Sequence, residues 1–311
     1  MSEKLNAAVV GVGYLGRFHA QKYNAINEVN LVGVCDASKD RADQVAQELQ
    51  CPAFYDYHDL INKVDLVTIA STTSSHYEVS KFFLENNVHV NVEKPMTTTS
   101  QQGEELCKIA QDKNLVLQVG MVERFNPALI SAQEKFTHPL FIECHRLAPY
   151  TPRGADVSVV LDLMIHDLDV ILSLVKSPPV SVSAIGTPVL TKTADIANAR
   201  IEFESGAVAN VTSSRVSTKT QRKFRCFQPN QYLSIDFGSG EVNLLTKTGE
   251  MQGDELPIET EAWNLEKGDA LMAETLAFIK AVKTGNPPFV SGQDGLVALK
   301  LAEQIIDAIG K

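Results

Sequence analysis

A glycine-rich motif near the N-terminus constrains the fold more than any other feature of the sequence. It follows the apolar residues 5–10, precedes the helical residues 17–26, and consists of Gly11, Val12, Gly13, Tyr14, Leu15 and Gly16. In a strand–turn–helix unit, Gly11 permits the tight turn, Gly13 lets a ligand approach the backbone, and Gly16 lets the helix pack closely on the sheet. The N–H groups at the start of such a helix bind phosphate groups. The motif therefore predicts a dinucleotide site with contacts from Gly11, Gly13, Tyr14, Leu15 and Gly16.

Asp36 indicates which dinucleotide this site prefers. It ends a second apolar strand, residues 30–35, and stands 20 residues past the third glycine. A carboxylate there accepts hydrogen bonds from the adenosine ribose hydroxyls and repels a 2′-phosphate, which favours NAD over NADP. Lys39 and Arg41 lie close by in the sequence and keep NADP possible. The alternative is a glycine-rich turn that holds no cofactor.

Apolar strands and helices continue to alternate through the first third of the chain. Strands are predicted at residues 53–55, 65–71, 88–92 and 115–120, with helices at 38–49, 74–86 and 100–112. This rhythm predicts a parallel, doubly wound sheet, in which ligands bind at the carboxyl ends of the strands. Two of those ends are polar, and we expect their side chains to face the cofactor: Ser71, Thr72 and His76, and Glu93 and Lys94.

The chain changes character at residues 119–127. An apolar strand ends there, and a Glu-Arg-Phe-Asn quartet precedes Pro127 and a new helical stretch. Proline suits the first turn of a helix, and Asn126 suits its N-cap. Arg124 and Asn126 either contact the substrate beside the cofactor or only brace the hinge and cap the helix. We place the domain boundary here, with an NAD(P)-binding domain over residues 1–122 and a substrate-binding and oligomerisation domain over residues 123–311.

A long apolar helix predicted over residues 159–175 carries one polar stripe. At 100° per residue, its polar members fall within about 60° of one another; they are Asp162, His166, Asp169 and Ser173. Because nearly all the other residues are apolar, the helix should be buried. Burying an aspartate with a histidine is costly unless they are paired or functional. We interpret Asp162 and His166 as catalytic candidates and Asp169 as structural support; the alternative is a purely structural histidine.

The rest of the chain predicts one large sheet closed by two helices. Strands are expected at residues 140–147, 180–187, 194–203, 207–216, 222–228, 231–237 and 241–246, and helices at 267–283 and 292–309. The Glu204-Ser205-Gly206 segment is a hairpin signal. One face of the sheet should pack on helices. The other face carries small or polar residues (Asn210, Thr212 and Ser214) and is a candidate oligomer interface.

Together these motifs resemble those of the Gfo/Idh/MocA oxidoreductases, which include glucose–fructose oxidoreductase and inositol dehydrogenase. The glycine motif with Asp36, the Thr-Thr-Ser-Ser-His segment, the Glu-Lys-Pro end and a D-x-x-x-H helix follow one another over essentially the whole chain. The resemblance implies a Rossmann domain, then a domain built on a large open, mainly antiparallel sheet, and a homo-oligomer (dimer or tetramer) formed through that sheet. It also implies that Lys94 lies beside the nicotinamide and the substrate, that His166 accepts the proton of the substrate alcohol, and that Asp162 assists it.

The substrate is predicted from two arginines ahead of the polar helix. Arg146 and Arg153 lie near its approach, and paired arginines suit a phosphate or pyrophosphate, which favours a nucleotide sugar over a free polyol. The R-x-x-P-x-x-x-R segment also resembles the branch of the family that oxidises UDP-N-acetylglucosamine at C3. The alternatives are surface ion pairs for both arginines and an inositol or free-sugar dehydrogenase. A non-catalytic, dinucleotide-sensing regulator is a further alternative, but it would not need Lys94 or the Asp/His stripe.

Composition excludes several other classes of partner. The formal charge is −10 with no basic block, so nucleic acid and anionic membranes are poor partners. No apolar run approaches the roughly 20 residues that span a bilayer, and the N-terminus shows no signal peptide. The five cysteines have no pairing or metal-ligand spacing, so we expect reduced thiols, a cytoplasmic protein and no metal site.

Overall fold

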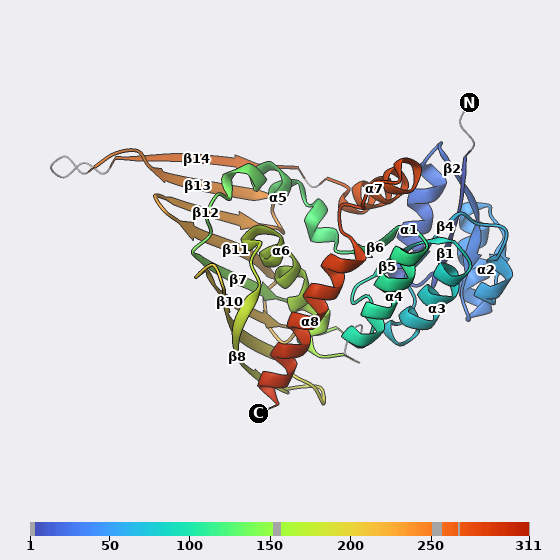
Figure 1. Ribbon diagram of the computed structural model, residues 1–311, viewed down its shortest axis with the longest axis horizontal. Helices are drawn as coiled ribbons and strands as arrows, with labels where there is room; N and C mark the ends of the chain where they lie inside the picture. The colour runs from blue at the N-terminus through green and yellow to red at the C-terminus, as the bar shows by residue number, and fades with distance from the viewer. Residues whose placement is uncertain (1–3, 152–156, 251–256, 267, 311) are drawn as a thin grey trace. The chain divides into compact units, whose positions relative to one another are not determined.

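The computed structural model describes residues 4–151, 157–250, 257–266 and 268–310, and its chain divides into two compact units (Figure 1). The first unit comprises Met1–Met121 with Leu271–Val297, and the second comprises Val122–Ala270 with Ala298–Lys311. The chain thus passes between units close to the expected boundary of 122 and 123. We expected residues 271–297 in the second domain, but they pack with the first compact unit.

The first unit is a parallel six-stranded sheet with helices between successive strands. In the sheet the strands follow the order β3-β2-β1-β4-β5-β6, so the switch in direction lies between β1 and β4. The strands are β1 (Leu5–Val10), β2 (Val29–Cys35), β3 (Ala53–Phe54), β4 (Leu66–Ile69), β5 (His89–Glu93) and β6 (Leu117–Gly120). The helices are α1 (Tyr14–Ala25), α2 (Lys39–Leu49), α3 (Thr73–Glu85) and α4 (Ser100–Asp112). The predicted doubly wound Rossmann fold is confirmed.

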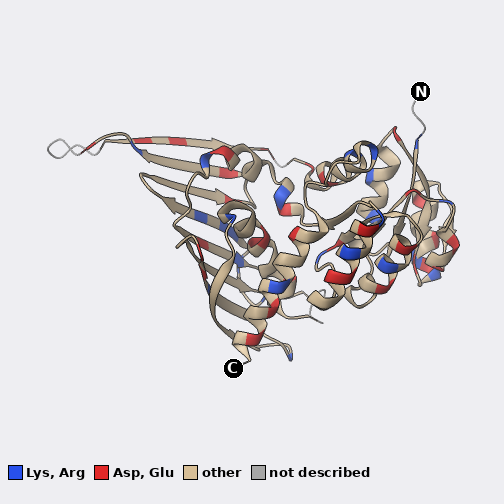
Figure 2. Cartoon of the chain, viewed as in Figure 1, with Lys and Arg blue, Asp and Glu red and all other residues tan. Residues whose placement is uncertain are grey.

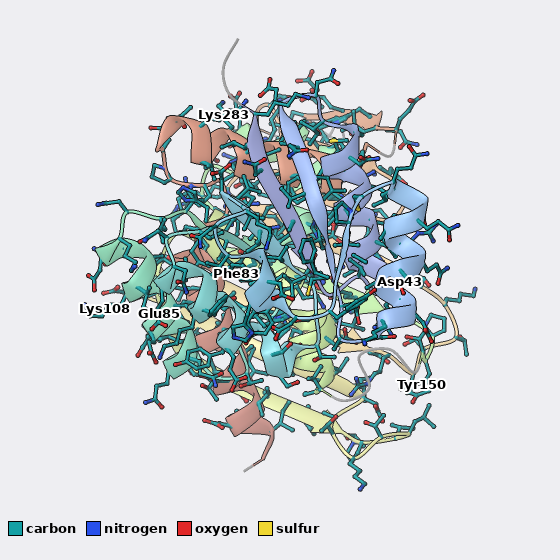
Figure 3. The ribbon with its side chains drawn as sticks, turned by 90° about the vertical axis from the view of Figure 1, so that its right-hand side faces the viewer. Asp43, Phe83, Glu85, Lys108, Tyr150 and Lys283 are labelled. Carbon is teal, nitrogen blue, oxygen red and sulfur yellow. The ribbon has the colours of Figure 1, made fainter. Side chains whose placement is uncertain are left out.

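Burial explains why the first unit folds this way. The strands are buried on both faces, as parallel sheets require, and β4 has no exposed residue. Figure 3 shows the fully buried Phe83 of α3 inside this unit, with Asp43 and Lys108 at its surface. Helix α7 (Ala270–Thr284) places Phe278 and two neighbours in the same apolar core as α1, β1 and β2. That shared core, which forms only in three dimensions, is the physical reason that residues 271–297 join the first unit.

The second unit is built on an eight-stranded sheet with the order β14-β13-β12-β11-β7-β10-β9-β8. The strands are β7 (Phe141–Leu147), β8 (Pro179–Thr187), β9 (Ile196–Phe203), β10 (Val208–Ser214), β11 (Gln221–Gln228), β12 (Gln231–Asp236), β13 (Glu241–Lys247) and β14 (Ile258–Asn264). All neighbouring strands pair antiparallel except β7 and β10, which pair parallel. The sheet confirms the predicted, mainly antiparallel architecture, but the sequence did not indicate β14.

The inner face of this sheet is covered by helices of the same unit. Inward residues of the strands, such as Ile142, Val211 and Phe224, share one core with α6 (Ile165–Val175) and with Ile305 of α8 (Gly292–Ile309). Figure 1 shows these helices on one side of the sheet. The helix predicted over 159–175 is split into a π-helical turn, Val160–Met164, and α6. Such π turns are frequent at functional sites.

Charged residues are interspersed over the described part of the chain. Figure 2 shows basic residues scattered among acidic ones on the helices of the first unit. Within the ranges that the structure covers, none of the helices has the length and apolar character needed to cross a membrane.

Candidate active site

The glycine loop between β1 and α1 is tightly packed on one side and open on the other. Gly11 has a φ of +85°, and a Cβ atom there would meet the Ser71 backbone at 2.4 Å. A Cβ on Gly16 would lie 1.8 Å from the carbonyl oxygen of Gly11, whereas one on Gly13 would meet nothing within 4 Å. Gly13 is also the N-cap of α1 and has no side chain to cap the first N–H groups. The loop therefore fits a pyrophosphate at Gly13.

Asp36 lies directly after β2 at the edge of a cavity of about 680 Å³, which is also lined by Gly11, Gly13, Arg41, Ser71 and Thr72. Its carboxylate is only 7% exposed and accepts hydrogen bonds from the backbone N–H groups of Val12 (2.9 Å) and Ser38 (2.9 Å). Arg41 Nη1 lies 3.3 and 3.4 Å from its two oxygens. These bonds fix the carboxylate at the carboxyl end of β2, where an adenosine ribose is expected.

His76 is a buried residue that contacts two backbone carbonyl groups. It is 1% exposed, and its ring nitrogens lie 2.9 Å from the Pro95 carbonyl oxygen and 3.1 Å from that of Ser71. Burial lowers the pKa of His76, although these two carbonyl contacts oppose that change. The ring thus ties the end of β4 to the Glu-Lys-Pro segment. These contacts give His76 a structural role, and its predicted contact with the cofactor stays a prediction.

Glu93 and Lys94 stand at the carboxyl end of β5, next to β4 in the sheet. Glu93 is buried and its Oε1 lies 2.8 Å from Nε2 of His19, while Lys94 is partly exposed. Burial alone would raise the pKa of Glu93. The hydrogen bond from His19 and the charge of Lys94 outweigh burial, so the pKa of Glu93 lies below its ordinary value. A carboxylate therefore stands beside the lysine.

In the second unit, the predicted catalytic helix carries its two candidates at its start. Asp162 lies in the π-helical turn and His166 in the first turn of α6, and both are partly buried. Asp169, further along α6, is buried and receives Arg124 Nη1 at 3.3 Å. Asp169 therefore gives structural support, as its place on the stripe predicts. Arg124 thus pairs with α6, and its contact with the substrate, the other role that we considered, stays a prediction.

Arg146 is a structural residue in this molecule, and its predicted contact with a diphosphate is wrong. It is 4% exposed and lies on the inner face of β7. Its Nε and Nη2 donate to the two carboxylate oxygens of Asp167 at 2.9 and 2.8 Å, and its Nη1 donates to Glu123 at 2.8 Å. Burial raises the pKa of Asp167, and Arg146 opposes that rise. Because a guanidinium stays charged and faces both oxygens, the pair is ionic.

Asn126 has the capping role that its position predicts. Its side chain accepts a hydrogen bond from the Ala128 N–H at 3.0 Å, and Pro127 is the first residue of α5 (Pro127–Ala132).

Asn126 also lines a cavity of about 430 Å³ together with Arg222 and Glu266. The side chain of Arg222 is 49% exposed. We did not identify Arg222 from the sequence. Its position opposite Arg146 results from the pairing of β11 with β7, which the sequence alone does not show. Arg153 lies outside the described residues.

Comparison with known proteins agrees with this arrangement. Residues 5–121 match the model of the oxidoreductase family with an NAD-binding Rossmann fold, and residues 135–231 match the GFO/IDH/MocA C-terminal domain. Over 308 residues the chain is 39% identical to UDP-N-acetylglucosamine 3-dehydrogenase of Acidithiobacillus ferrooxidans, covering 98% of this chain and 97% of that protein. It is 28% identical to myo-inositol 2-dehydrogenase of Thermotoga maritima, covering 96% of this chain and 94% of that protein.

Solved structures show the same relationship. The structure of UDP-N-acetylglucosamine 3-dehydrogenase from Acidithiobacillus ferrooxidans has a TM-score of 0.92 at 38% identity and covers 99% of this chain and 98% of its own. Levoglucosan dehydrogenase in complex with NADH shares the fold, with a TM-score of 0.87 at 20% identity over 99% of this chain and 97% of its own. The chain therefore belongs to the Gfo/Idh/MocA oxidoreductases, and its first domain is an NAD-binding Rossmann domain.

Proposed function

We propose that the protein is an NAD-dependent dehydrogenase that oxidises the 3-hydroxyl group of UDP-N-acetylglucosamine. The observation that carries this proposal is the identity of 39% over 98% of the chain to an enzyme of that name. The identities to the inositol dehydrogenases of Thermotoga maritima and Bacillus subtilis are 28% and 29%. An inositol or free-sugar dehydrogenase is therefore the second candidate.

The proposed chemistry uses three residues of this chain. His166 accepts the proton of the substrate hydroxyl as a general base, and Asp162 orients the histidine. Lys94 hydrogen-bonds the same oxygen and stabilises the negative charge that develops on it. NAD, when bound, accepts the hydride from the substrate carbon. In the reverse direction His166 returns the proton to the nascent alkoxide.

Several described residues fit the binding of NAD. The open side of Gly13 gives the pyrophosphate access to the backbone, and Asp36 lies where the ribose hydroxyls are expected. For the substrate, we retain Arg153 as a predicted ligand of the diphosphate. We add Arg222 as a candidate, because its half-exposed guanidinium lines a cavity with Asn126 and has one contact with a carboxylate, Nη1 to Glu123 Oε1 at 3.6 Å. Arg146 is not included, because Asp167 and Glu123 engage its guanidinium.

We also propose that the chain forms a homo-oligomer through the outer face of the eight-stranded sheet, in the cytoplasm. Apolar side chains exposed on that face include Ile185 (70%), Ile196, Phe227 and Ile258. Asn210 and Thr212 lie there too, whereas Ser214 is buried. The five cysteines are free thiols, as expected in a reducing compartment.

A direct assay tests the substrate. The purified protein is incubated with NAD and either UDP-N-acetylglucosamine, UDP-glucose, N-acetylglucosamine or myo-inositol, and NADH formation is followed by absorbance. We expect turnover with UDP-N-acetylglucosamine and a product oxidised at C3. Turnover with myo-inositol and none with the nucleotide sugars would replace the first candidate by the second.

A further inference from the structure

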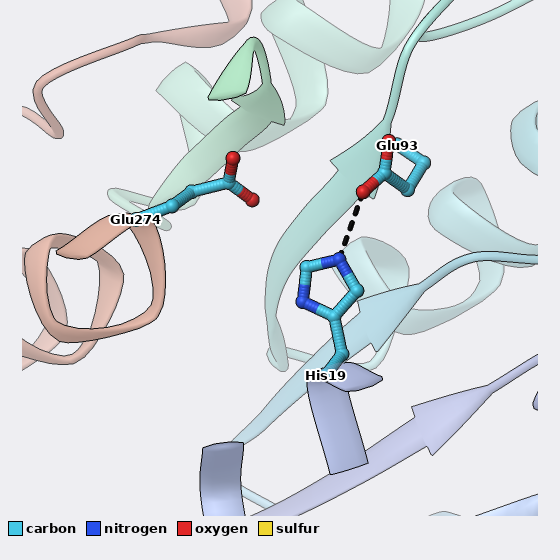
Figure 4. A group of neighbouring side chains, drawn as sticks. All are labelled: His19, Glu93 and Glu274. Carbon is cyan, nitrogen blue, oxygen red and sulfur yellow. Dashed lines mark hydrogen bonds and ion pairs between the residues drawn. The ribbon is translucent and has the colours of Figure 1, made fainter. Parts of the chain in front are cut away.

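A buried cluster of three ionisable side chains lies behind the Glu-Lys-Pro end of β5. His19 comes from α1, Glu93 from β5 and Glu274 from α7, and all three belong to the first unit. One ligating atom of each lies within 4.8 Å of the others. Figure 4 shows the Glu274 carboxyl group pointing toward the His19–Glu93 pair. His19 and Glu274 are completely buried.

Two atoms of this cluster lack hydrogen-bond partners among the described residues. They are Nδ1 of His19 and Oε2 of Glu274. His19 places Nε2 against the Glu93 carboxylate, so Nε2 carries a hydrogen and Nδ1 of a neutral ring is an acceptor. Oε2 becomes a donor when Glu274 is protonated. The two atoms do not hydrogen-bond each other directly, so a single proton on Glu274 gives both a complementary partner through one bridging water.

Among the described residues, the groups that contact Glu274 include no cation that could balance a second carboxylate. Asn91 Nδ2 donates to its Oε1 at 3.4 Å, and Gln118 Nε2 donates to its backbone oxygen at 3.2 Å. Tyr23 contacts Thr68 at 2.7 Å, and burial raises its pKa, so it stays neutral. The ionisable groups that influence Glu93 are His19, Lys94 and His76, and of these Lys94 carries the positive charge. Burial and the charge of Glu93 raise the pKa of Glu274 well above its ordinary value.

We propose that Glu274 keeps its proton and shares it with His19, so that a hydrogen-bonded chain from Glu274 through His19 ends on the Glu93 carboxylate beside Lys94. The three groups then carry one negative charge in total, wherever the shared proton lies. Glu274 is thus a positioning residue that fixes Glu93 and, through it, the environment of Lys94. The catalytic part of this inference rests on the proposed function; the protonation state of Glu274 does not.

Thermal unfolding of the full chain against pH tests the protonation state without a substrate. An acid whose pKa is raised in the folded protein contributes stability that is fully present below its unfolded pKa and is lost as pH rises toward the folded value. Glu274→Gln cannot lose a proton and can still donate a hydrogen bond. We expect Glu274→Gln to match the wild type near pH 4.5 and to unfold at increasingly higher temperature than the wild type as pH rises. Glu274→Met lacks the donor and should unfold at lower temperature throughout.

The control is Thr275→Val on the same helix, because the Thr275 hydroxyl bonds only its own helix backbone, at Leu271, among the described residues. It should leave the pH dependence of unfolding unchanged. The proposal is overturned if Glu274→Gln is destabilised as much as Glu274→Met at every pH. It is also overturned if metal analysis finds one divalent cation per chain that both variants lose, since the same three residues are a possible ligand set.

The positioning role is tested by the pH profile of kcat/KM for NADH formation with UDP-N-acetylglucosamine. Glu274→Met should lower kcat roughly tenfold and shift the alkaline limb of the profile. Glu274→Gln should keep both the kcat and the alkaline limb of the wild type. An unshifted profile in Glu274→Met would limit Glu274 to a structural role. Absence of turnover in the wild type would contradict the proposed function and leave the unfolding result standing.

Discussion

At the scale of single residues, the sequence was most informative at positions where the backbone conformation accepts only certain residue types. Gly11 and Gly16 were identifiable because only glycine fits the space against Ser71 and Gly11. Asn126 was identifiable because a helix start needs a cap. By contrast, the structural roles of His76 and Arg146 depend on their burial and on contacts with residues distant in sequence, Pro95 and Asp167. A polar residue near a site can either face the ligand or support the residues that do, and spacing alone does not separate the two.

The first residue-scale prediction concerns Asp36. Its carboxylate is held at the carboxyl end of β2 by two backbone N–H groups, where it can accept bonds from ribose hydroxyls. Hydrogen bonds to a charged group contribute about 1.5–3 kcal/mol, so Asp36→Ala should weaken NAD binding roughly 10- to 100-fold and narrow the preference over NADP. Titration with both cofactors measures this. A wild-type protein that binds NADP more tightly would contradict the assignment.

The second residue-scale prediction concerns Lys94 and His166, the pair that we propose to be catalytic. Lys94→Ala and His166→Ala should each lower kcat by roughly two to four orders of magnitude, because each removes a group that handles the proton or the charge of the reacting oxygen. NAD binding should persist in both, which fluorescence titration can verify. His166→Asn should show the same loss with less disturbance of packing. Near-normal turnover in either alanine variant is incompatible with the assigned role.

At the scale of elements, Glu123 and Arg124 at the start of the second unit brace α6, the helix that we propose to be catalytic. Glu123 accepts Arg146 from β7, while Arg124 pairs with Asp169 on α6. Arg146 also pairs with Asp167, which neighbours His166. Strand and helix positions were predictable from periodicity, since alternation along β7 and the apolar character of α6 follow directly from burial. The brace was not predictable, because each of its ion pairs joins elements separated by at least 20 residues.

Because the ion pairs of this brace are buried, we expect a single substitution in it to cause a large loss of stability. Asp167→Asn removes the charge opposite a buried guanidinium and should lower the free energy of unfolding by about 3 kcal/mol, measured by urea denaturation. Lys108→Ala is the control: its pair with Asp112 at 2.7 Å is exposed on α4 of the first unit and should contribute less than about 1 kcal/mol. Equal losses in the two variants would show that the buried network does not anchor the helix. Under conditions in which Asp167→Asn stays folded, the fold-decrease in kcat should be larger than the fold-increase in the KM for NAD.

At the scale of the whole molecule, the alternation of strands and helices predicted the parallel sheet of the first domain, whereas the mainly antiparallel type of the second sheet was implied by the resemblance to the family. The sequence did not place residues 271–297, whose apolar residues find their core only in the first unit. The outer face of the eight-stranded sheet is the surface that we propose as the oligomer interface. Ile185 is 70% exposed there, and Phe227 stacks against Tyr232 and Phe141 with ring centroids 4.9 and 5.7 Å apart.

The final prediction follows from that face. If copies of the chain associate through it, the mass measured by light scattering should be a multiple of 34.0 kDa, and the double variant Ile185→Glu/Phe227→Glu should bring charge into an apolar contact and shift the mass toward the monomer. Leu276→Glu is the control, since Leu276 is also exposed and apolar but lies on α7 of the first unit. NAD binding should be unchanged in both variants, because Asp36 and the glycine loop belong to the first unit. A wild-type protein that is monomeric at micromolar concentration, or a double variant that keeps the wild-type mass, would rule out this face as the interface.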